Sequence, residues 1–237
     1  MMAGMAGPVG TMLLRYKKAD ASVQPSVPRD SKKILSHKLI QPTLKPHPRA
    51  PPPPMTRRIV LTMDRHIIPE VGLRWFVGNL TLVMPDEPLL SAAHYKRSYE
   101  KTSVLHVKRN EVIDFVFNNV GTETGPHPFH LHGHQMWYLG VGTEAGLWNT
   151  TRDMAKLNTQ DPPLCDVFEI PHNGWAAVRV KVDNAGAWIF HCHISPHHMA
   201  GMGFVMMVDA DCAPPPPRGF PTHCRSYPSR FLWPNIV

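Results

Sequence analysis

A run of three metal-binding side chains, His191, Cys192 and His193, restricts the backbone that this part of the chain can adopt. In an extended strand successive side chains point to opposite faces, so the two imidazoles share one face and the thiol lies on the other. One short tripeptide can therefore serve two metal sites at once if it forms a β-strand. The sequence thus predicts a strand here, with a metal site on each side of it.

Further ligands follow shortly after the thiol, because the chain continues to His197 and Met202. Two imidazoles, one thiolate and a weak axial thioether form a type 1, or blue, copper site. Cys192, His197 and Met202 can supply three of these four ligands. We expect the remaining imidazole upstream, in the histidine-rich segment 127–134, HPFHLHGH.

Side-chain alternation divides the upstream histidines between the two sites. His130 and His132 share a face, whereas His127 lies an odd number of residues away and can turn to the opposite side. We therefore expect one copper centre that is held by His127, Cys192, His197 and Met202. Behind it we expect a second centre that gathers four imidazoles, those of His130, His132, His191 and His193.

The two segments HPFHLHGH (127–134) and HCHISPHHMAGM (191–202) resemble the two copper signatures in the C-terminal domain of multicopper oxidases, the family of laccases, ferroxidases and ascorbate oxidases. The segments DPPL (161–164), GWAAVR (174–179) and DNAGAW (183–188) resemble plant ascorbate oxidases and laccases most. This likeness runs from about Arg57 to Ala210. The chain departs from the family at Cys165, where Arg is frequent, and at Ser195, where an acidic residue is common.

The resemblance implies a role for each of these residues. His127, Cys192 and His197 would bind the type 1 copper, with Met202 as the axial ligand. His130 would bind the type 2 copper, and the type 3 pair would be bound by His132, His191 and His193. A small-molecule reducing substrate would deliver single electrons at the type 1 copper. The catalytic route would then run from His197 and Cys192 to His191 and His193, where a trinuclear copper cluster reduces dioxygen to water.

Half of that cluster is missing from this sequence. In the family the first domain donates the other ligands through two further HxH motifs, but the remaining histidines here are isolated: His37, His47, His66, His94, His106, His172 and His223. The 237 residues suffice for one domain with flanking segments and not for three domains. We expect the isolated chain to be incomplete for dioxygen reduction, and to need the missing N-terminal domains or a second chain.

The resemblance also predicts the domain organisation. Residues 10–16, GTMLLRY, resemble the last strand of the family's middle domain, and the Pro-rich stretch after them resembles the linker to the third. We expect residues 1–58 to be the end of a preceding domain plus a basic linker, 59–211 a cupredoxin-like domain, and 212–237 a C-terminal tail. Met1 would then lie inside a longer parent protein. The alternative is a natural one-domain protein with a disordered basic arm.

Charge is distributed unevenly between these parts. Residues 1–58 hold eleven Lys or Arg and two Asp, a net charge of +9. Residues 59–237 hold fourteen Lys or Arg and sixteen Asp or Glu, a net charge of −2. A basic tail can bind nucleic acid or a membrane surface, but only Tyr16 interleaves these charges as an aromatic residue. We therefore expect a solvated linker and no nucleic-acid partner.

Other signals bear on the location of the parent protein. No stretch of about 20 apolar residues occurs, so we expect no membrane span. The sequons at Asn79 and Asn149 permit glycosylation, which is typical of a secreted or extracellular protein. In such a protein Cys212 could form a disulfide with Cys224 or with another domain, and Cys165 is left as the odd thiol.

Hydrophobic periodicity predicts an all-β fold, and short strands between turn signals favour a Greek-key β-sandwich. The resemblance implies that this sandwich is cupredoxin-like. Alternation places one apolar face at Ile113, Phe115 and Phe117, and another at Val178, Val180 and Val182. Turn signals occur at residues 108–111 and 183–186. We expect neighbouring strands at 129–139 and 188–194, with residues 203–208 closing the sheet.

Two other functions compete with the oxidase. A stand-alone blue-copper electron carrier would use only the type 1 site, and a zinc protein could use the same Cys and His ligands. Several neighbouring residues have structural interpretations: His134 and His198 as supporting residues, and Trp137, Tyr138 and Trp188 as core. Trp75 resembles a position near the substrate pocket of ascorbate oxidases, although a core role suits it equally well.

Overall fold

The structure is a computed structural model that describes residues 51–95, 102–121, 125–143, 145–215, 20, 22, 41, 44–46 and 217–218. The chain divides into two compact units, Met1–Lys38 and Leu39–Val237. In the first unit only Asp20 and Ser22 are described, and the Ser22 hydroxyl donates to the Asp20 carboxylate at 2.7 Å. The strand predicted at 10–16 and most of the Pro-rich linker lie outside the described residues.

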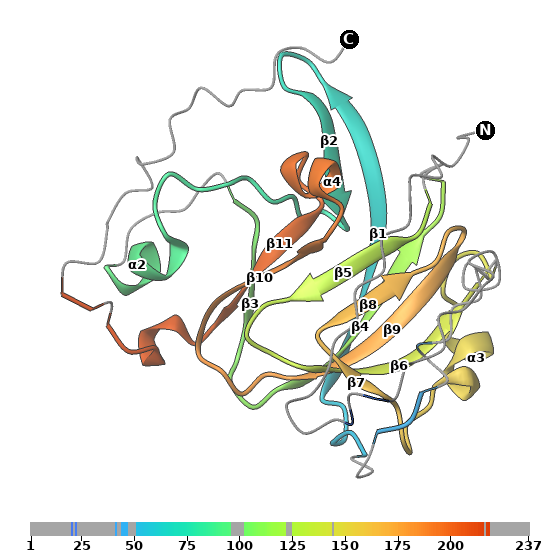
Figure 1. Cartoon of the computed structure of the whole chain (residues 1–237). Coiled ribbons are helices and arrows are strands. Elements are labelled where there is room, and N and C mark those ends of the chain that lie inside the picture. Colours follow the sequence, from blue (N-terminus) through green and yellow to red (C-terminus); the bar gives the residue numbers. More distant parts are fainter. Residues whose placement is uncertain are drawn as a thin grey trace. The chain divides into compact units, whose positions relative to one another are not determined.

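The second unit contains two β-sheets, which Figure 1 shows as two layers. One has six strands in the order β2 (Gly72–Val77), β1 (Arg57–Ile68), β4 (Val112–Asn119), β9 (Gly174–Lys181), β6 (Met136–Gly142) and β7 (Leu164–Cys165). The other has five strands in the order β3 (Val104–Val107), β11 (Gly203–Val208), β10 (Gly186–Cys192), β5 (His127–Leu131) and β8 (Val167–Ile170). The predicted all-β sandwich is confirmed.

The strands that carry the histidine motifs are neighbours, as the sequence predicts. β10 pairs antiparallel with β5, with His191 opposite His130 and Cys192 opposite Phe129. Cys192 and Phe129 lie in the core cluster between the sheets. Because side chains alternate along a strand, His191 and His130 lie on the outer face of the five-stranded sheet.

The core between the sheets contains both predicted apolar faces, from residues 113–117 of β4 and residues 178–182 of β9 and its end. The outward side of β4 is buried as well, since all eight of its residues are buried. Segment 145–157 covers this side, where Trp148 packs edge-on against Trp175 with ring centroids 4.7 Å apart. The segment includes α3 (Thr150–Asp153) and the 3-10 turn η2 (Met154–Lys156).

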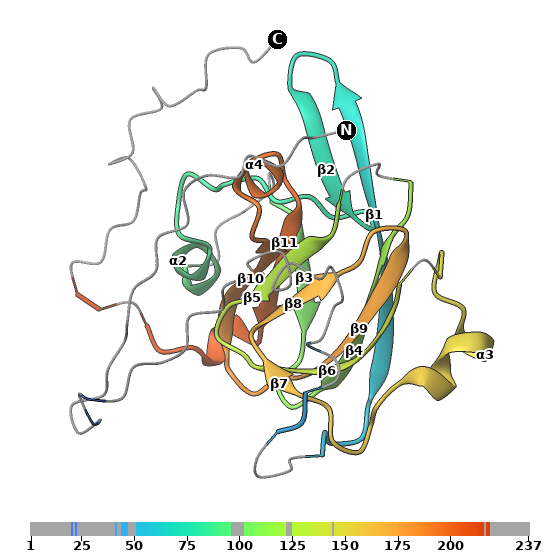
Figure 2. The same ribbon diagram turned by 45° about the vertical axis from the view of Figure 1, so that its right-hand side comes forward.

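The outer face of the five-stranded sheet is covered over only part of its length. Leu82 and Leu89 pack against Val205 and Met207 of β11, and Leu89 opens the short helix α2 (Leu89–His94). Figure 2 shows α2 beside β10 and β11, and α3 on the far side of the domain, beyond β9. Two further elements lie at strand ends, α4 (Ser195–Met199) and η3 (Ala210–Cys212). No helix among the described residues is long and apolar enough to cross a membrane.

Two details of the predicted strands are wrong. Residues 129–139 form two strands in different sheets, because the chain turns at Gly133, which has a φ of +67°. A Cβ at Gly133 would overlap the Trp188 ring, so this turn favours glycine. The strand at 203–208 does not close the sheet, since β3 pairs with β11 on its other side.

Candidate metal centres

Three elements bring one thiol and two imidazoles together between the sheets. Cys192 ends β10 and His127 begins β5, and both point toward the core. His197 comes from α4, whose backbone is fixed by a bond from the His197 N–H to the Ile194 carbonyl at 3.0 Å. We call the group of His127, Cys192 and His197 the inner centre; its three ligand atoms lie within 4.8 Å of one another.

The distances within the inner centre suit a bound metal ion. The Cys192 sulfur lies 3.8 Å from His127 Nδ1 and 3.9 Å from His197 Nδ1, and the two nitrogens are 3.2 Å apart. A trigonal metal with bonds of about 2.1 Å to nitrogen and about 2.3 Å to sulfur holds nitrogen and sulfur about 3.8 Å apart and the two nitrogens about 3.6 Å apart. The donor set therefore fits one transition-metal ion without a change of backbone.

Met202 lies next to this group in the fold. Its carbonyl accepts from the Cys192 N–H at 3.0 Å, and its N–H donates to the His197 carbonyl at 2.9 Å. The side chain is buried in the same core cluster as Cys192. The preceding Gly201 has a φ of +104°, and a Cβ there would clash with Thr81. This tight loop fixes Met202 relative to both ligands, and its axial role remains a prediction.

Burial keeps the two imidazoles of the inner centre neutral. It lowers the pKa of His127 to about 3, and the charges of His197 and His172 act in the same direction. Burial also lowers the pKa of His197, assisted by the charge of Arg65. The thiol pKa of Cys192 rises to about 11, again through burial. Neutral imidazoles offer their lone pairs to a metal, and metal binding would displace the thiol proton.

Trp75 forms a wall of the inner centre. Its ring centroid lies 4.9 Å from that of His197 and 5.5 Å from that of His127. The side chain is only 1% exposed, and the backbone N–H of Trp75 donates to the Ala200 carbonyl at 2.8 Å. Trp75 therefore has the core position that the sequence allowed, and its ring also contacts both imidazoles.

Four imidazoles gather on the other side of β10, on what we call the outer imidazole face: His130, His132, His191 and His193. The ring of His130 lies 4.8 Å from that of His132, 5.9 Å from that of His191 and 6.1 Å from that of His193. His132 and His193 are exposed, whereas His191 is buried. The structure thus separates the eight predicted ligands into the two groups that alternation indicates.

Backbone carbonyls orient two of these rings, a detail that the sequence does not reveal. His130 Nδ1 lies 2.7 Å from the Asp166 carbonyl, and His191 Nδ1 lies 2.9 Å from the Cys192 carbonyl. A ring that donates through Nδ1 presents the Nε2 lone pair to a metal. His132 Nε2 and His191 Nε2 are 3.1 Å apart, close enough for a shared ion.

The outer imidazole face nevertheless differs from the inner centre in completeness. Among the described residues the inner centre is the one group in which three His, Cys or carboxylate donors lie within 4.8 Å of one another. Burial lowers the pKa of His191 to about 4, with the charges of His198, His132 and His130 acting in the same direction. His191 is therefore a neutral donor on a face that the described residues have not closed around a metal.

His134 and His198 lie beside the ligands, as expected of supporting residues. The His134 ring packs edge-on against Trp188, and its Nδ1 lies 3.3 Å from the His132 carbonyl. The His198 ring lies 4.2 Å from that of His191. Tyr138 lies in the main core and Trp188 packs against it, while Trp137 packs against a smaller cluster of buried residues. The predicted core roles are therefore confirmed.

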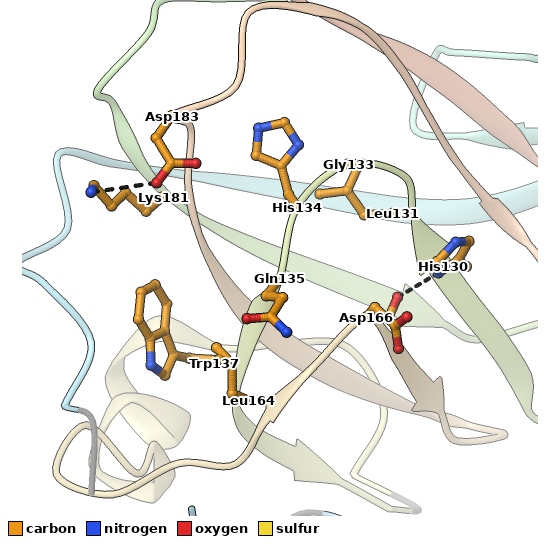
Figure 3. Close-up of a pocket in the computed structure, with 10 residues that line it drawn as sticks. All are labelled: His130, Leu131, Gly133, His134, Gln135, Trp137, Leu164, Asp166, Lys181 and Asp183. Carbon is orange, nitrogen blue, oxygen red and sulfur yellow. Dashed lines mark hydrogen bonds and ion pairs between the residues drawn. The ribbon is translucent and has the colours of Figure 1, made fainter. Parts of the chain in front are cut away.

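A hollow of about 520 Å³ opens beside His130, and Figure 3 shows the residues around it. Trp137 and Leu164 contribute apolar surface. Lys181 and Asp183, which also line it, form an ion pair at 3.4 Å. The hollow gives solvent a way to the side of His130, on the same side of β10 as the outer imidazole face.

The other thiols stay apart from both groups. Cys165 is half-buried on β7, and burial raises its pKa to about 12. Cys212 is exposed and free, while its possible partner Cys224 lies outside the described residues. Neither thiol joins the three-donor group.

Comparison with known proteins agrees with this geometry. The multicopper oxidase family model matches residues 80–211. The L-ascorbate oxidase of Nicotiana tabacum is 31% identical over 237 residues, which cover 84% of this chain and 40% of that protein. Laccase-11 of Arabidopsis thaliana is 28% identical, over 90% of this chain and 46% of that protein. The chain therefore belongs to the multicopper oxidase family, whose members are copper-dependent oxidoreductases, and spans less than half the length of these relatives.

Solved structures show the same fold. The laccase from Botrytis aclada has a TM-score of 0.62 and 22% identity, over 82% of this chain and 35% of that chain. Fet3p, described as a multicopper oxidase that functions in iron import, has a TM-score of 0.58 and 24% identity, over 82% and 38% of the two chains. These similarities confirm the cupredoxin-like sandwich.

Proposed function

We propose that this chain is the part of a multicopper oxidase that receives electrons from a reducing substrate and passes them to a dioxygen-reducing copper cluster. His127, Cys192 and His197 would hold a type 1 copper, with Met202 as its axial ligand. The observation that carries the proposal is the inner centre itself, where one sulfur and two nitrogens lie 3.2 to 3.9 Å apart. A copper ion in this site would supply one-electron redox chemistry at nearly fixed ligands.

The route from one side of β10 to the other is short. Cys192 shares peptide bonds with both His191 and His193, so an electron that enters at the thiolate reaches the outer imidazole face through a few covalent bonds. The packed core holds Cys192 and His127 at 0% exposure, which keeps water away and limits ligand movement. His197 is half-buried and offers the edge nearest to an external donor.

On the outer imidazole face, His130 would bind a type 2 copper, and His132, His191 and His193 would bind a type 3 pair. Three coppers need roughly twice as many ligands as four imidazoles at two to three protein ligands per metal. The other half would come from N-terminal domains of a longer protein or from a second chain. The exposed His132 and His193 leave this face accessible to such a partner.

Two arguments favour the oxidase over the alternatives. An electron carrier needs only the inner centre and has no use for four further imidazoles on the opposite side of the same strand. A structural zinc site takes four tetrahedral ligands. Among the described residues the inner centre has three such donors next to a buried methionine, which suits copper better.

The first test is the colour of the copper-loaded chain. A thiolate bound to copper(II) gives an intense visible absorption band, so we expect this band after loading under reducing conditions and reoxidation. We expect no steady oxygen consumption with a phenolic or ascorbate substrate while the chain is monomeric. Turnover by a monomer that carries one copper would contradict the half-cluster proposal, and turnover by a dimer alone would indicate a second chain as the partner.

The location of the parent protein is also a proposal. Asn79 and Asn149, which begin the two sequons, are both exposed. We propose a secreted glycoprotein, in agreement with this exposure. Mass spectrometry of the protein from its native source, before and after glycosidase treatment, would test this.

A further inference from the structure

α4 carries two successive histidines that lead to different sides of β10. Side chains of successive helical residues point about 100° apart, so one short helix can reach both groups of metal-binding residues. The His197 ring lies 5.0 Å from that of His127 in the inner centre. The His198 ring lies 4.2 Å from that of His191 on the outer imidazole face. α4 therefore brings a fifth imidazole to this face.

The backbone of α4 fixes the position of His198. Its N–H donates to the Ile194 carbonyl at 3.0 Å, and its carbonyl accepts from the Gly201 N–H at 2.9 Å. The side-chain Nε2 is buried and has no hydrogen-bond partner within the described part of the chain. Buried polar atoms are nearly always bonded to a neighbour, so this nitrogen is available to a ligand.

The ring distances around His191 suit one shared metal ion. Two imidazoles that bind a metal at about 2.0 Å and about 90° to 110° have ring centroids about 4.5 to 5.2 Å apart. The rings of His132 and His191 are 5.2 Å apart at an interplanar angle of 54°, and their Nε2 atoms are 3.1 Å apart. The two imidazoles of the inner centre have nearly the same ring values, 5.0 Å and 57°. The ring of His198, 4.2 Å from that of His191, is close to this range.

His198 needs a side-chain movement to join this pair. The inner centre is the one described group whose three donor atoms lie within 4.8 Å of one another, so a nitrogen of His198 has to come closer. Its ring is tilted by only 32° from that of His191, and rotation about the Cβ–Cγ bond exchanges the positions of ring nitrogens and carbons. This rotation leaves the hydrogen bonds of α4 intact, because they join backbone atoms alone.

The three imidazoles are neutral donors near pH 7. Burial lowers the pKa of His191 to about 4. Burial also lowers the pKa of His132 and that of His198, and the charges of neighbouring imidazoles act in the same direction. A metal ion therefore does not have to displace a proton from any of them. Imidazole suits copper and zinc, and three imidazoles with an open fourth position can hold zinc.

We propose that His132, His191 and His198, which we call the three-imidazole site, bind one divalent copper or zinc ion that this chain holds without a partner. The proposal rests on the proposed function in one respect, because it takes the outer imidazole face to be a metal-binding surface. It adds His198 to the ligands of that face and gives the face a metal ion before another domain or chain covers it. Binding of the ion changes no oxidation state and transfers no atom.

Zinc is the probe for the direct test, since it is redox-inert and leaves NMR signals visible. Zn(II) is titrated into the isotope-labelled chain, and the ring nitrogens of each histidine are followed separately. The result therefore does not depend on whether the inner centre takes the first ion. We expect one ring nitrogen each of His132, His191 and His198 to shift to the position of metal-bound nitrogen while sedimentation shows a monomer. Unchanged nitrogens of His198, or binding only in a dimer, would overturn the proposal.

His198→Phe separates a metal ligand from a ring that only positions His191. Phenylalanine keeps an aromatic ring beside His191 and supplies no nitrogen. The zinc affinity of the outer face should fall at least about tenfold, the lower end of the loss that removal of a supporting partner causes. Competition with a chelator measures it in the Cys192→Ser background, where the inner centre lacks its sulfur. Full affinity in the His198 variant would overturn the proposal.

His134→Phe is the matched control. It removes another imidazole whose buried Nε2 has no partner among the described residues, but whose ring packs against Trp188. This variant should keep the zinc affinity, and an equal loss in both variants would also overturn the proposal. The two proposals fail separately. Absence of the visible copper band would refute only the proposed inner centre, whereas a blue chain whose His198 nitrogens do not respond to zinc would refute only the three-imidazole site.

Discussion

The two sides of β10 differ in how far this chain completes them. On the inner side three donors from β5, β10 and α4 lie within 4.8 Å of one another and are enclosed by core residues. On the outer side four imidazoles lie close together, but two of them, His132 and His193, are exposed. One strand therefore carries a group that its own domain encloses and a group that is open to solvent, as expected if another domain or chain covers the second group in the proposed oxidase.

The same contrast is visible along the outer face of the five-stranded sheet. At one end Leu82, Leu89 and the rest of α2 bury the apolar side chains of β11. At the other end His132 and His193 are exposed, and the ring of His198 lies over that of His191 at 4.2 Å. A domain that covers its apolar residues and leaves a group of imidazoles open is suited to work against a partner surface.

The largest expected effect is that of Cys192→Ser, which removes the thiolate of the inner centre. We expect complete loss of the visible band, because a serine hydroxyl does not supply the sulfur ligand that produces it. Absorption spectroscopy of the copper-loaded variant is the measurement. Cys165→Ser is the matched control, since that thiol lies on β7 outside the three-donor group. A band that survives in the Cys192 variant would mean that the inner centre is not the blue site.

Gly201→Ala should damage the inner centre through its loop. A non-glycine residue at a φ of +104° is strained, and the new Cβ would clash with Thr81. We expect a loss of about 1–3 kcal/mol in the free energy of unfolding and weaker copper binding at the inner centre. Gly72→Ala has a similar φ of +87° with nothing within 4 Å of its Cβ. Equal copper affinity in the two variants, measured by competition with a chelator, would contradict a role for this loop in positioning Met202.

His132→Ala probes the open side. The side chain is exposed, so we expect the free energy of unfolding to change by less than about 0.5 kcal/mol. A copper titration of the wild type should show one tight site and weaker binding to the pair His132 and His191, whose Nε2 atoms are 3.1 Å apart. The variant should lose the weak binding and keep the blue band. His106→Ala, on β3, should alter neither.

The smallest expected effect is that of Met202→Leu. A weak thioether ligand stabilises copper(II), so its removal should raise the reduction potential while the copper stays bound. We expect a shift on the order of 59 mV, which is a tenfold change for a one-electron couple. Redox titration of both proteins is the measurement, with Met206→Leu, a buried methionine of the same core, as the control. An unchanged or lower potential would show that Met202 is not axial.

Local alternation was sufficient to predict how the ligands divide between two faces. The parity of His191, Cys192 and His193 needs only an extended backbone, and the period of two in residues 113–117 and 178–182 predicts the core sides of β4 and β9. The prediction of one strand at 129–139 is wrong because alternation does not show where a chain leaves one sheet for another. The glycine at position 133 was the available sequence signal for that turn, because glycine readily adopts a positive φ, as Gly133 does here.

Contacts between distant segments could not be predicted in the same way. The carbonyl of Asp166 orients His130 through a backbone atom, so no residue type signals it. Trp75 reaches His127 and His197 only because β2 bonds to the chain after α4. The position of Arg65 depends in turn on the register of the β1–β2 hairpin, which places it opposite Trp75. These partners follow from tertiary packing, which a pattern along one strand does not contain.

Both candidate metal centres depend on the register of β10. Insertion or deletion of one residue between Phe190 and His193 would turn the thiol outward and bring imidazoles into the core, since side chains alternate with a period of two. Both centres would then fail together, although each has ligands from other elements. A partly misfolded chain with shifted register would lose the proposed copper site and the proposed partner surface at the same time. If the inner centre binds copper as proposed, the visible band would report correct strand pairing of β10 during assembly of the protein.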